Sequence, residues 1–367
     1  MTLENILELV KASDAKDSKL YFVTRAIKHG VARRSRIRDK YLFKVYQIDC
    51  NREVQESLFN TSINQIEKII NKNFEIVDYD VLSDETERLF TYPIQNKIFS
   101  FSDVVTNQLQ KVTEKVTSIA NITTENEELW AYCLEFYSFD SKKKVFTFRK
   151  ILPSKVGIDE KAKSCLKTLF NTKSQQLTLL KEETVNLDEQ IDCIYVDDTF
   201  YIIKKAYFEQ IVGLQEEYKE KAKGIAENMI NSGNVIGGEK LQELIDSKPS
   251  IHKKLIKVER NGGYKDLTPQ KLNSMKRICK KYGDVLPTKD GKLFIDNEQN
   301  VDIILKALGD YYKIGEISKK AYGTFAGKEL QTKVNKTLAE LEKDGTLKKL
   351  SEKYFNGDFV PEASKFK

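Results

Sequence analysis

The sequence predicts an α+β protein of two domains, in which antiparallel strand pairs pack against helices and a helical tail follows at the C-terminus. Two observations support this prediction: apolar runs of strand length occur in pairs joined by short polar links, and longer stretches carry apolar residues at helical spacing. Strands and helices also come in blocks. A regular alternation of the two would instead indicate a doubly wound parallel sheet.

The first domain is expected at residues 1–122. Its expected elements are a helix within 1–18, strands at 20–24 and 41–48, and helices at 63–70 and from 105 to about 120. The polar, acidic stretch at 122–128 is expected to be the boundary with the second domain.

The second domain is expected at residues 129–329, with a helical extension at 330–367. Its expected elements are hairpins formed by 129–139 with 144–151 and by 191–196 with 200–204, helices at 207–231, 240–247, 269–281 and 301–308, and a strand at 292–296. Gly233 is expected to end the helix that begins at residue 207, because glycine readily adopts positive φ.

Composition excludes several classes of protein. The 367 residues include 19 Phe and 17 Tyr, enough aromatic mass for a core, so a disordered chain is not expected. Mean hydropathy is −0.49, and no apolar run approaches the ~18 residues that span a bilayer. The first ten residues carry acidic side chains where a secretory signal carries basic ones, so we expect the protein in the cytoplasm.

Positive charge is concentrated in a basic segment, residues 25–44. The segment has a net charge of +7 and the whole chain +6, so the remainder of the chain sums to −1. Its basic residues are Arg25, Lys28, Arg33, Arg34, Arg36, Arg38, Lys40 and Lys44, against the single acidic residue Asp39. Such a concentration favours a polyanionic partner, and arginine in particular suits phosphate or a guanine edge. The sequence therefore predicts DNA binding here.

Other interpretations of the basic segment remain open. A solvated face beside the strand at 41–48 explains the same residues, and a lipid surface would need an apolar helical face that the segment lacks. Further lysines are expected to extend the binding face: Lys142, Lys143 and Lys144 at a hairpin tip, Lys253, Lys254, Lys257 and Arg260, and Lys276, Arg277, Lys280 and Lys281 on a helix. Tyr264, beside two glycines, is placed either to stack on a base or to pack locally.

Catalytic motifs are weak. The chain has two histidines, His29 and His252, both expected on the surface, and five separated cysteines expected as reduced thiols. A loop at 323–329 resembles a phosphate-binding loop, but its glycines are one residue too close and Glu329 replaces the metal-binding hydroxyl.

A metal-dependent nuclease is the enzymatic alternative. Its candidate residues are Asp192, Asp197, Asp198, Lys204 and Glu209. Asp197 and Asp198 also suit a hairpin turn, and this structural interpretation is favoured. We therefore predict a protein that is not an enzyme, with no catalytic residues, metal, cofactor or small-molecule ligand.

Phe146-Thr-Phe-Arg-Lys-Ile-Leu-Pro-Ser-Lys155 and the stretches 191–204 and 207–209 resemble the KwaB family, the soluble component of the two-gene Kiwa anti-phage system of bacteria. Residues 257–264, 303–310 and 317–322 extend the resemblance, which covers about 130–329. It implies a cytoplasmic, dimeric, DNA-binding effector that works with the membrane protein KwaA to block phage DNA replication and late transcription, and a partner that recruits it to the inner face of the membrane. No family motif maps onto a DNA site, so the basic segment is inferred from charge.

The C-terminal residues 328–358 are similar to the terminal helices of periplasmic amino-acid-binding proteins. This similarity covers about thirty residues, and the ligand groups of that family lie elsewhere, so it does not imply transport. Three hypotheses follow: a DNA-binding defence protein, a metal-dependent nuclease, and a basic module that meets an acidic protein or a lipid surface. A steep salt dependence of affinity would favour the first, and Mg²⁺-dependent cleavage the second.

Overall fold

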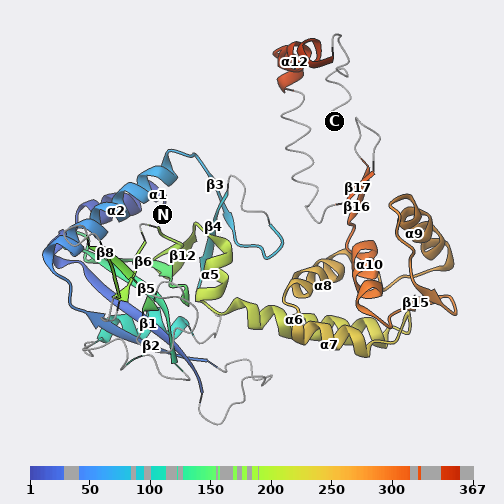
Figure 1. Cartoon of the computed structure of the whole chain (residues 1–367), viewed down its shortest axis with the longest axis horizontal. Coiled ribbons are helices and arrows are strands. Elements are labelled where there is room, and N and C mark those ends of the chain that lie inside the picture. Colours follow the sequence, from blue (N-terminus) through green and yellow to red (C-terminus); the bar gives the residue numbers. More distant parts are fainter. Residues whose placement is uncertain are drawn as a thin grey trace. The chain divides into compact units, whose positions relative to one another are not determined.

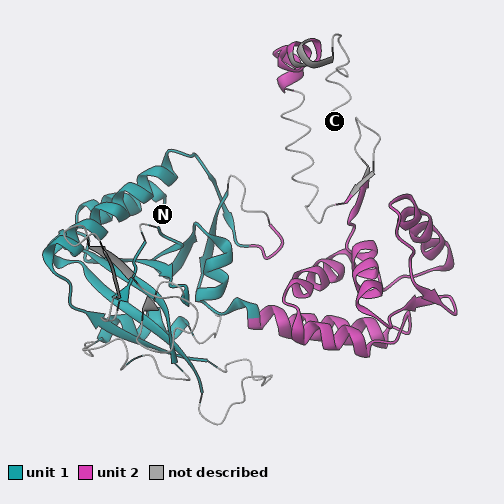
Figure 2. Cartoon of the chain, viewed as in Figure 1, with its two compact units in different colours: residues 1–79, 85–215 teal, residues 80–84, 216–367 magenta. Residues whose placement is uncertain are grey.

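A computed structural model gives the fold, and its chain divides into two compact units (Figure 2). Unit 1 comprises Met1–Tyr79 and Glu85–Gln215, and unit 2 comprises Asp80–Asp84 and Glu216–Lys367. The residues that the structure describes are 1–28, 41–83, 88–94, 101–112, 122, 127–153, 156–157, 168–171, 176–179, 184–188, 190–314, 321–323 and 340–355.

Unit 1 is built on an eight-stranded sheet with the order β2-β1-β5-β6-β11-β12-β4-β3 (Figure 1). Neighbouring strands are antiparallel except β3 and β4, which are parallel. The strands are β1 (Lys19–Ile27), β2 (Tyr41–Ile48), β3 (Glu75–Asp78), β4 (Arg88–Pro93), β5 (Glu127–Ser138), β6 (Lys143–Lys150), β11 (Cys193–Val196) and β12 (Thr199–Ile202). Short pairs also form between β7 (Val156–Gly157) and β10 (Thr184–Val185) and between β8 (Thr168–Asn171) and β9 (Gln176–Leu179).

Helices α1 (Leu3–Lys11) and α2 (Arg52–Ile70) cover one face of this sheet (Figure 1). In the chain, the short helix η1 (Ala15–Asp17) and the strands β1 and β2 lie between these two helices. Helix α1 begins where Thr2 and Asn5 cap each other reciprocally. Its apolar positions Ile6 and Val10, three to four residues apart, are fully buried and share a core with Ile66 of α2.

The opposite face of the sheet is aromatic. Rings contact one another, edge to face or tilted, from Phe43 of β2 to Phe101, to Phe148 of β6, to Phe200 of β12 and to Phe208 of α5 (Lys205–Ile211), with centroids 5.2–6.0 Å apart. Each such contact contributes about 0.5–1.5 kcal/mol beyond the burial of its area. Helices η2 (Val104–Gln108) and α3 (Leu109–Lys111) complete the described helices of unit 1.

Unit 2 is mainly helical, and a small three-stranded sheet with the order β13-β15-β14 adjoins its helices. Its core is apolar and includes the fully buried Leu255, Leu293 and Ile304. The elements are α6 (Leu214–Asn231), β13 (Val235–Ile236), α7 (Glu239–Ser247), α8 (Ser250–Asn261), α9 (Pro269–Lys281), β14 (Thr288–Lys289), β15 (Lys292–Phe294), α10 (Glu298–Leu308), β16 (Tyr312–Ile314), β17 (Ala321–Gly323) and α12 (Thr346–Phe355).

The structure confirms the α+β class and most elements that the sequence predicts, and the helices carry several of the differences. The helix expected from residue 105 to about 120 ends at Lys111, because Val112 is extended, and α2 begins at Arg52 instead of residue 63. The helix expected at 207–231 is two helices, because Gly213 adopts φ of +78° between α5 and α6. Gly233, with φ of +73°, follows α6 as expected. Helix α8 was not predicted, since its lysines obscure the apolar spacing of Ile251, Leu255 and Val258.

The stretch at 122–128, where the sequence analysis expects the domain boundary, lies within the compact unit 1. The reason is that β5, which begins at Glu127, pairs with β1 in one continuous sheet. Among the described residues, no helix is long and apolar enough to cross a membrane.

Gly237 between β13 and α7 is required by its surroundings. Its φ is +80°, and a Cβ there would lie 2.0 Å from the carbonyl oxygen of Ile295. We predict that Gly237→Ala lowers the free energy of unfolding by roughly 2 kcal/mol or more, since both backbone strain and a clash result. Gly233→Ala is the control, because Gly233 has φ of +73° with nothing within 4 Å. Urea unfolding of the two variants measures the difference, and equal losses would contradict the steric part of the prediction.

Candidate nucleic-acid interface

The basic segment connects β1 to β2, which pair with Arg25 opposite Phe43 and Thr24 opposite Lys44. Of its basic residues, Arg33, Arg34, Arg36, Arg38 and Lys40 lie outside the described residues, as does His29. The structure describes the three at its ends, Arg25, Lys28 and Lys44. The hairpin connection thus places the ends of the segment on two adjacent strands at one end of the sheet order.

Arg25 is held by residues of β5. Its Nε donates to Glu128 Oε1 at 2.9 Å, and its Nη2 donates to the same oxygen. The guanidinium carbon also lies 3.2 Å from the centroid of the Trp130 ring and 4.4 Å from that of Tyr41. Because its charge is neutralised within the protein, Arg25 serves mainly to fix the base of the β1–β2 connection.

Lys44 and Lys28 are engaged as well. Lys44 Nζ lies 3.8 Å from Glu127 Oε2, and Thr24 Oγ1 donates to Glu127 Oε1 at 2.5 Å. Lys28 also has a partner within the chain. The carboxylates of Glu127 and Glu128 therefore anchor the base of the basic segment to β5.

Trp130 receives a second cation, Lys150 of β6. The Nζ of Lys150 lies 3.6 Å from the ring centroid and donates to the carbonyl oxygens of Trp130 and Ile151 at 3.0 and 2.6 Å. The indole Nε1 of Trp130 donates to the carbonyl of Ile211 at 3.1 Å. Burial lowers the pKa of Lys150 from its ordinary 10.5 to about 8.

A buried ion network lies beside Lys150. Arg149 donates to both carboxylate oxygens of Asp188, at 2.7 and 2.8 Å, and to Asp192 Oδ1 at 2.6 Å. The other oxygen of Asp192 accepts from the backbone N–H of Lys150 at 2.7 Å. Burial raises the pKa of Asp192 to about 6, against the effects of this N–H and of Arg149. Burial alone would lower the pKa of Arg149. The hydrogen bonds and charges of Asp188 and Asp192 outweigh burial and raise this pKa, so the guanidinium of Arg149 stays charged at neutral pH.

This network accounts for Asp192, the first carboxylate of the nuclease alternative, and the other acidic candidates have separate partners, while the side chain of Lys204 is exposed. Asp197 and Asp198 form the two-residue turn between β11 and β12, with φ of +46° and +56°. Lys143 donates to Asp197 at 2.5 Å, Tyr195 to Asp198 at 2.9 Å, and Tyr79 to the buried Glu209 at 2.8 Å. In the described parts of the chain, no group of three or more His, Cys, Asp or Glu is arranged to hold a metal ion.

The lysines of the β5–β6 hairpin lie among carboxylates. Lys142, in the turn with φ of +55°, is exposed. Lys144 lies 3.2 Å from Glu135, whose carboxylate is 3% exposed and also accepts from Tyr21 at 2.7 Å.

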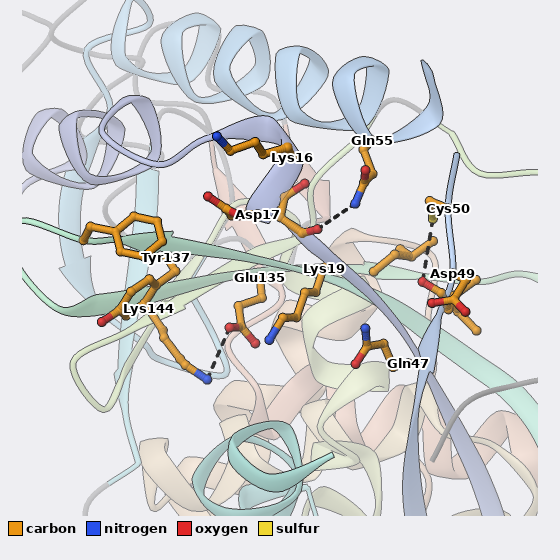
Figure 3. A pocket seen from close by; sticks show the side chains of 14 residues that line it. Lys16, Asp17, Lys19, Gln47, Asp49, Cys50, Gln55, Glu135, Tyr137 and Lys144 are labelled. Atoms are coloured by element: carbon orange, nitrogen blue, oxygen red, sulfur yellow. Dashed lines mark hydrogen bonds and ion pairs between the residues drawn. The ribbon is translucent and has the colours of Figure 1, made fainter. Parts of the chain in front are cut away.

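Lys144 lines a hollow of about 520 Å³ at the end of this hairpin (Figure 3). Three lysines and three carboxylates line it: Lys16, Lys19, Lys144, Asp17, Asp49 and Glu135. The hollow therefore carries no excess of positive charge.

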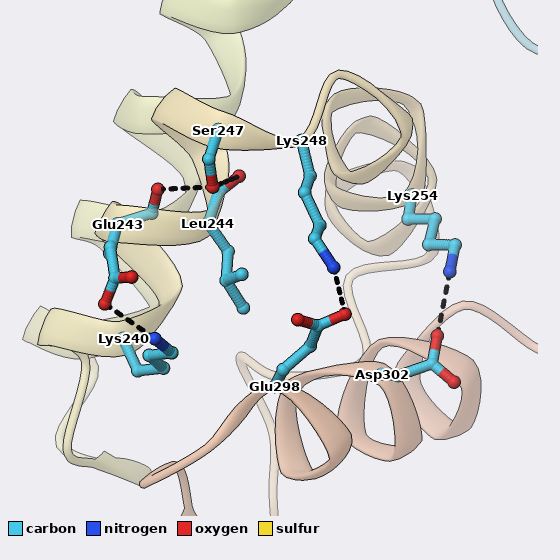
Figure 4. Close-up of polar contacts among 8 residues, drawn as sticks. All are labelled: Lys240, Glu243, Leu244, Ser247, Lys248, Lys254, Glu298 and Asp302. Carbon is cyan, nitrogen blue, oxygen red and sulfur yellow. Dashed lines mark hydrogen bonds and ion pairs between the residues drawn. The ribbon is translucent and has the colours of Figure 1, made fainter.

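The lysines expected at 253–257 lie on α8, and two of them contact neighbouring helices. Lys254 Nζ donates to Asp302 of α10 at 2.8 Å, next to the ion pair of Lys248 with Glu298 (Figure 4). Lys253 lies over the ring of Tyr218, and Lys257 has a partner within the chain too. Helix α8 thus stabilises unit 2 through these contacts.

Two further expectations concern residues of unit 2. The surface position predicted for His252 is wrong: the side chain is 5% exposed and its Nε2 lies 2.8 Å from the carbonyl oxygen of Ile245. Burial lowers its pKa. The lysines that follow His252 suggested a solvated run, but helical spacing turns it inward. Tyr264 packs locally, since it is 1% exposed and donates to Glu259.

The cysteines are reduced thiols where they are described. Cys133, Cys193 and Cys279 are buried and Cys50 is half-buried, while Cys165 lies outside the described residues. Burial raises the pKa of the Cys133 and Cys193 thiols well above the ordinary value.

A family model described as "Kiwa protein KwaB-like" matches residues 126–318, just over half of the chain. The chain belongs to this family. Membership in the KwaB-like family indicates a role in Kiwa anti-phage defence. The matched residues include Trp130, the Arg149 network and helices α6 to α10, and they begin after the basic segment.

A second comparison matches a short stretch. The "Probable amino-acid-binding protein YxeM" of Bacillus subtilis (strain 168) is 50% identical over 58 residues, which make up 16% of this chain and 22% of YxeM. The chain therefore spans about a fifth of the length of this relative, and the similarity is too short to carry an activity. No solved structure matches the chain significantly.

Removing Asp192 should cost far more stability than removing Asp197. We predict that Asp192→Ala lowers the free energy of unfolding by about 3 kcal/mol, because it leaves Nη1 of Arg149 and the backbone N–H of Lys150 without their acceptor in a buried site. Asp197→Ala breaks an ion pair whose side chains are 40% and 48% exposed, and it should cost about 1 kcal/mol or less. Urea unfolding at neutral pH compares the two, and similar losses would mean that the network contributes little.

The buried ammonium of Lys150 should impose a pH dependence on stability. Its pKa is lower in the folded protein, about 8, than in the unfolded chain, 10.5, so between these values only the unfolded chain keeps the proton. Stability due to Lys150 is therefore present at high pH and is lost as the pH falls through about 8. We predict that the stability of Lys150→Met relative to the natural protein falls by about 3 kcal/mol from pH 7 to pH 10.5. A difference that is constant with pH in urea unfolding would contradict the lowered pKa.

Proposed function

We propose that this member of the KwaB-like family is a cytoplasmic, DNA-binding effector of anti-phage defence that is not an enzyme. The observation that carries the proposal is the basic segment, which has eight basic residues and one acidic residue in twenty positions. Like charges held together repel one another, and a polyanion that neutralises them releases counterions on binding. Phage DNA supplies such a polyanion.

The contacts at the ends of the segment support this assignment of roles. Arg25 and Lys44 are paired with Glu128 and Glu127, so they hold the ends of the connection in place. The arginines between them, Arg33, Arg34, Arg36 and Arg38, are then the residues that we propose contact phosphates. Arginine forms two parallel hydrogen bonds to a phosphate, which suits it to this task.

The proposal includes partners. We propose that the chain forms a dimer, that a membrane protein resembling KwaA recruits it to the inner face of the membrane, and that DNA binding there blocks phage replication and late transcription. These relations are implied by the family resemblance.

A charge-removal variant tests the DNA site. Arg33, Arg34, Arg36 and Arg38 are replaced by alanine in the full chain, and duplex DNA binding is measured by fluorescence anisotropy from about 50 to 200 mM salt. We expect affinity to fall at least about tenfold, and the slope of log affinity against log salt to become shallower by roughly 3 to 4, because four phosphate contacts are lost.

The matched control removes four exposed lysines elsewhere in unit 1, on or next to α1 and α2: Lys11, Lys16, Lys68 and Lys72. This control changes net charge equally and should keep most of the affinity. Equal losses in both variants would reduce the effect to overall charge. DNA cleavage that requires Mg²⁺, or binding to anionic vesicles without binding to DNA, would favour the other hypotheses.

A further inference from the structure

Helix α9 of unit 2 carries an uncompensated positive charge. Its thirteen residues, Pro269–Lys281, include five basic residues and no acidic residue. The basic side chains Lys271, Lys276, Arg277, Lys280 and Lys281 are all exposed. Within the described residues, none of them forms an ion pair, whereas the lysines of α8 are engaged by α10 and α6. A helix with this charge lowers its own repulsion when it meets an anionic surface.

The outward face of α9 carries side chains that recognise bases. Leu272, Met275 and Cys279 are buried in the core of unit 2, which fixes the rotation of the helix about its axis. At 3.6 residues per turn, the opposite side presents Gln270, Asn273, Ser274, Arg277 and Lys281. Arg277 Nη2 donates to Ser274 Oγ at 3.2 Å, so these two side chains lie together. Arginine pairs with guanine, and asparagine or glutamine with adenine, through two hydrogen bonds each in the major groove.

The elements around α9 occur in a favourable order. Helix α8 ends at Gly262 with φ of +63°, a turn follows, and Thr268 caps the start of α9. The hairpin β14–β15 comes next in the chain, and its two-residue turn, Asp290 and Gly291, has φ of +50° and +72°. This order of elements also occurs in winged helix-turn-helix domains, whose second helix reads DNA, but the link between α8 and α9, residues 262–268, is longer than the three- to four-residue turn of that motif.

The hairpin adds positive charge beside this turn. Lys289 and Lys292 lie opposite each other in the register of β14 and β15, and both are exposed. Like charges directly opposite each other destabilise a strand pair unless an anion lies near them. Two lysines at a hairpin tip suit a phosphate on each side of a groove.

We infer that α9 enters the major groove of duplex DNA, with Arg277 and Asn273 at the base edges, Lys276, Lys280 and Lys281 at phosphates, and the β14–β15 hairpin at the flanking backbone. A helix with its side chains is about 10–12 Å wide and the groove about 12 Å, so a single helix fits. This inference rests on the proposed DNA binding and assigns to it a second contact, in unit 2, that reads sequence.

Two variants of the full chain test the inference. In the first, Lys276, Arg277, Lys280 and Lys281 are replaced by alanine, and we expect duplex affinity to fall at least about tenfold, with a salt slope shallower by roughly 3, because three phosphate contacts are lost. In the second, Arg277→Lys keeps the charge but loses the planar pair of donors. Selection from a random duplex library should then show a preference for guanine at one position that is reduced by about five- to a hundredfold.

The control is Arg260→Ala on α8, which removes one exposed arginine that is paired with Asp80 and lies outside the proposed site. It should retain the sequence preference of the natural protein. The altered residues of α9 are exposed, so circular dichroism should show the same fold in every variant.

The outcomes separate this inference from the proposed function. If the natural chain binds no DNA, both fail. If it binds and the variant of Arg33, Arg34, Arg36 and Arg38 is weakened while the α9 variants are unchanged, the inference is overturned and the proposed function stands. Equal weakening of single-stranded and duplex DNA by the α9 substitutions would also overturn it, because a groove-reading helix discriminates between them.

Discussion

The pairing of β1 with β5 is the contact on which unit 1 depends. It joins the first strands of the chain to the central strands of the sheet and brings Glu127, Glu128 and Trp130 next to the base of the basic segment. Without this pairing, Arg25 would lose the carboxylate of Glu128 and the ring of Trp130. The same strand continues to Ser138 and, through Trp130 and Lys150, contacts β6 and the end of α5.

The arrangement combines positive charge with local neutralisation. At the root of the basic segment, cations are matched by the acids of β5, and in the interior Arg149 is matched by Asp188 and Asp192. Helix α9 differs, because its charges have no such counterparts among the described residues. Pairing with acidic residues therefore separates two kinds of basic residue. The paired ones hold the fold together, and those of α9 remain open to a partner.

The sequence predicted most strands of the large sheet, though not β3 and β4, and it predicted the partners of its charged residues poorly. The apolar runs of β2 and β5 and the Asp197-Asp198 turn follow local rules of alternation and turn chemistry, which act within a few residues. The engagement of Arg25, Lys144 and Lys254 depends on Glu128, Glu135 and Asp302, which lie far away in the chain, so no local pattern could reveal it. The spacing of Leu272, Met275 and Cys279 on α9 did contain the information about its outward face, once a helix was assumed.

The position of β2 at one end of the sheet order has a consequence for association between molecules. A terminal strand exposes backbone donors and acceptors that can template pairing with another chain, which leads to aggregation. Here Gln108 Nε2 donates a hydrogen bond to the carbonyl oxygen of Phe43 in β2 at 2.9 Å, and Lys44 lies on the same strand. Two copies that approached edge to edge would also bring their arginine-rich connections together. The charge proposed to attract a nucleic acid would thus oppose pairing of two copies through the edge strand β2, and an assembly of copies would use another surface.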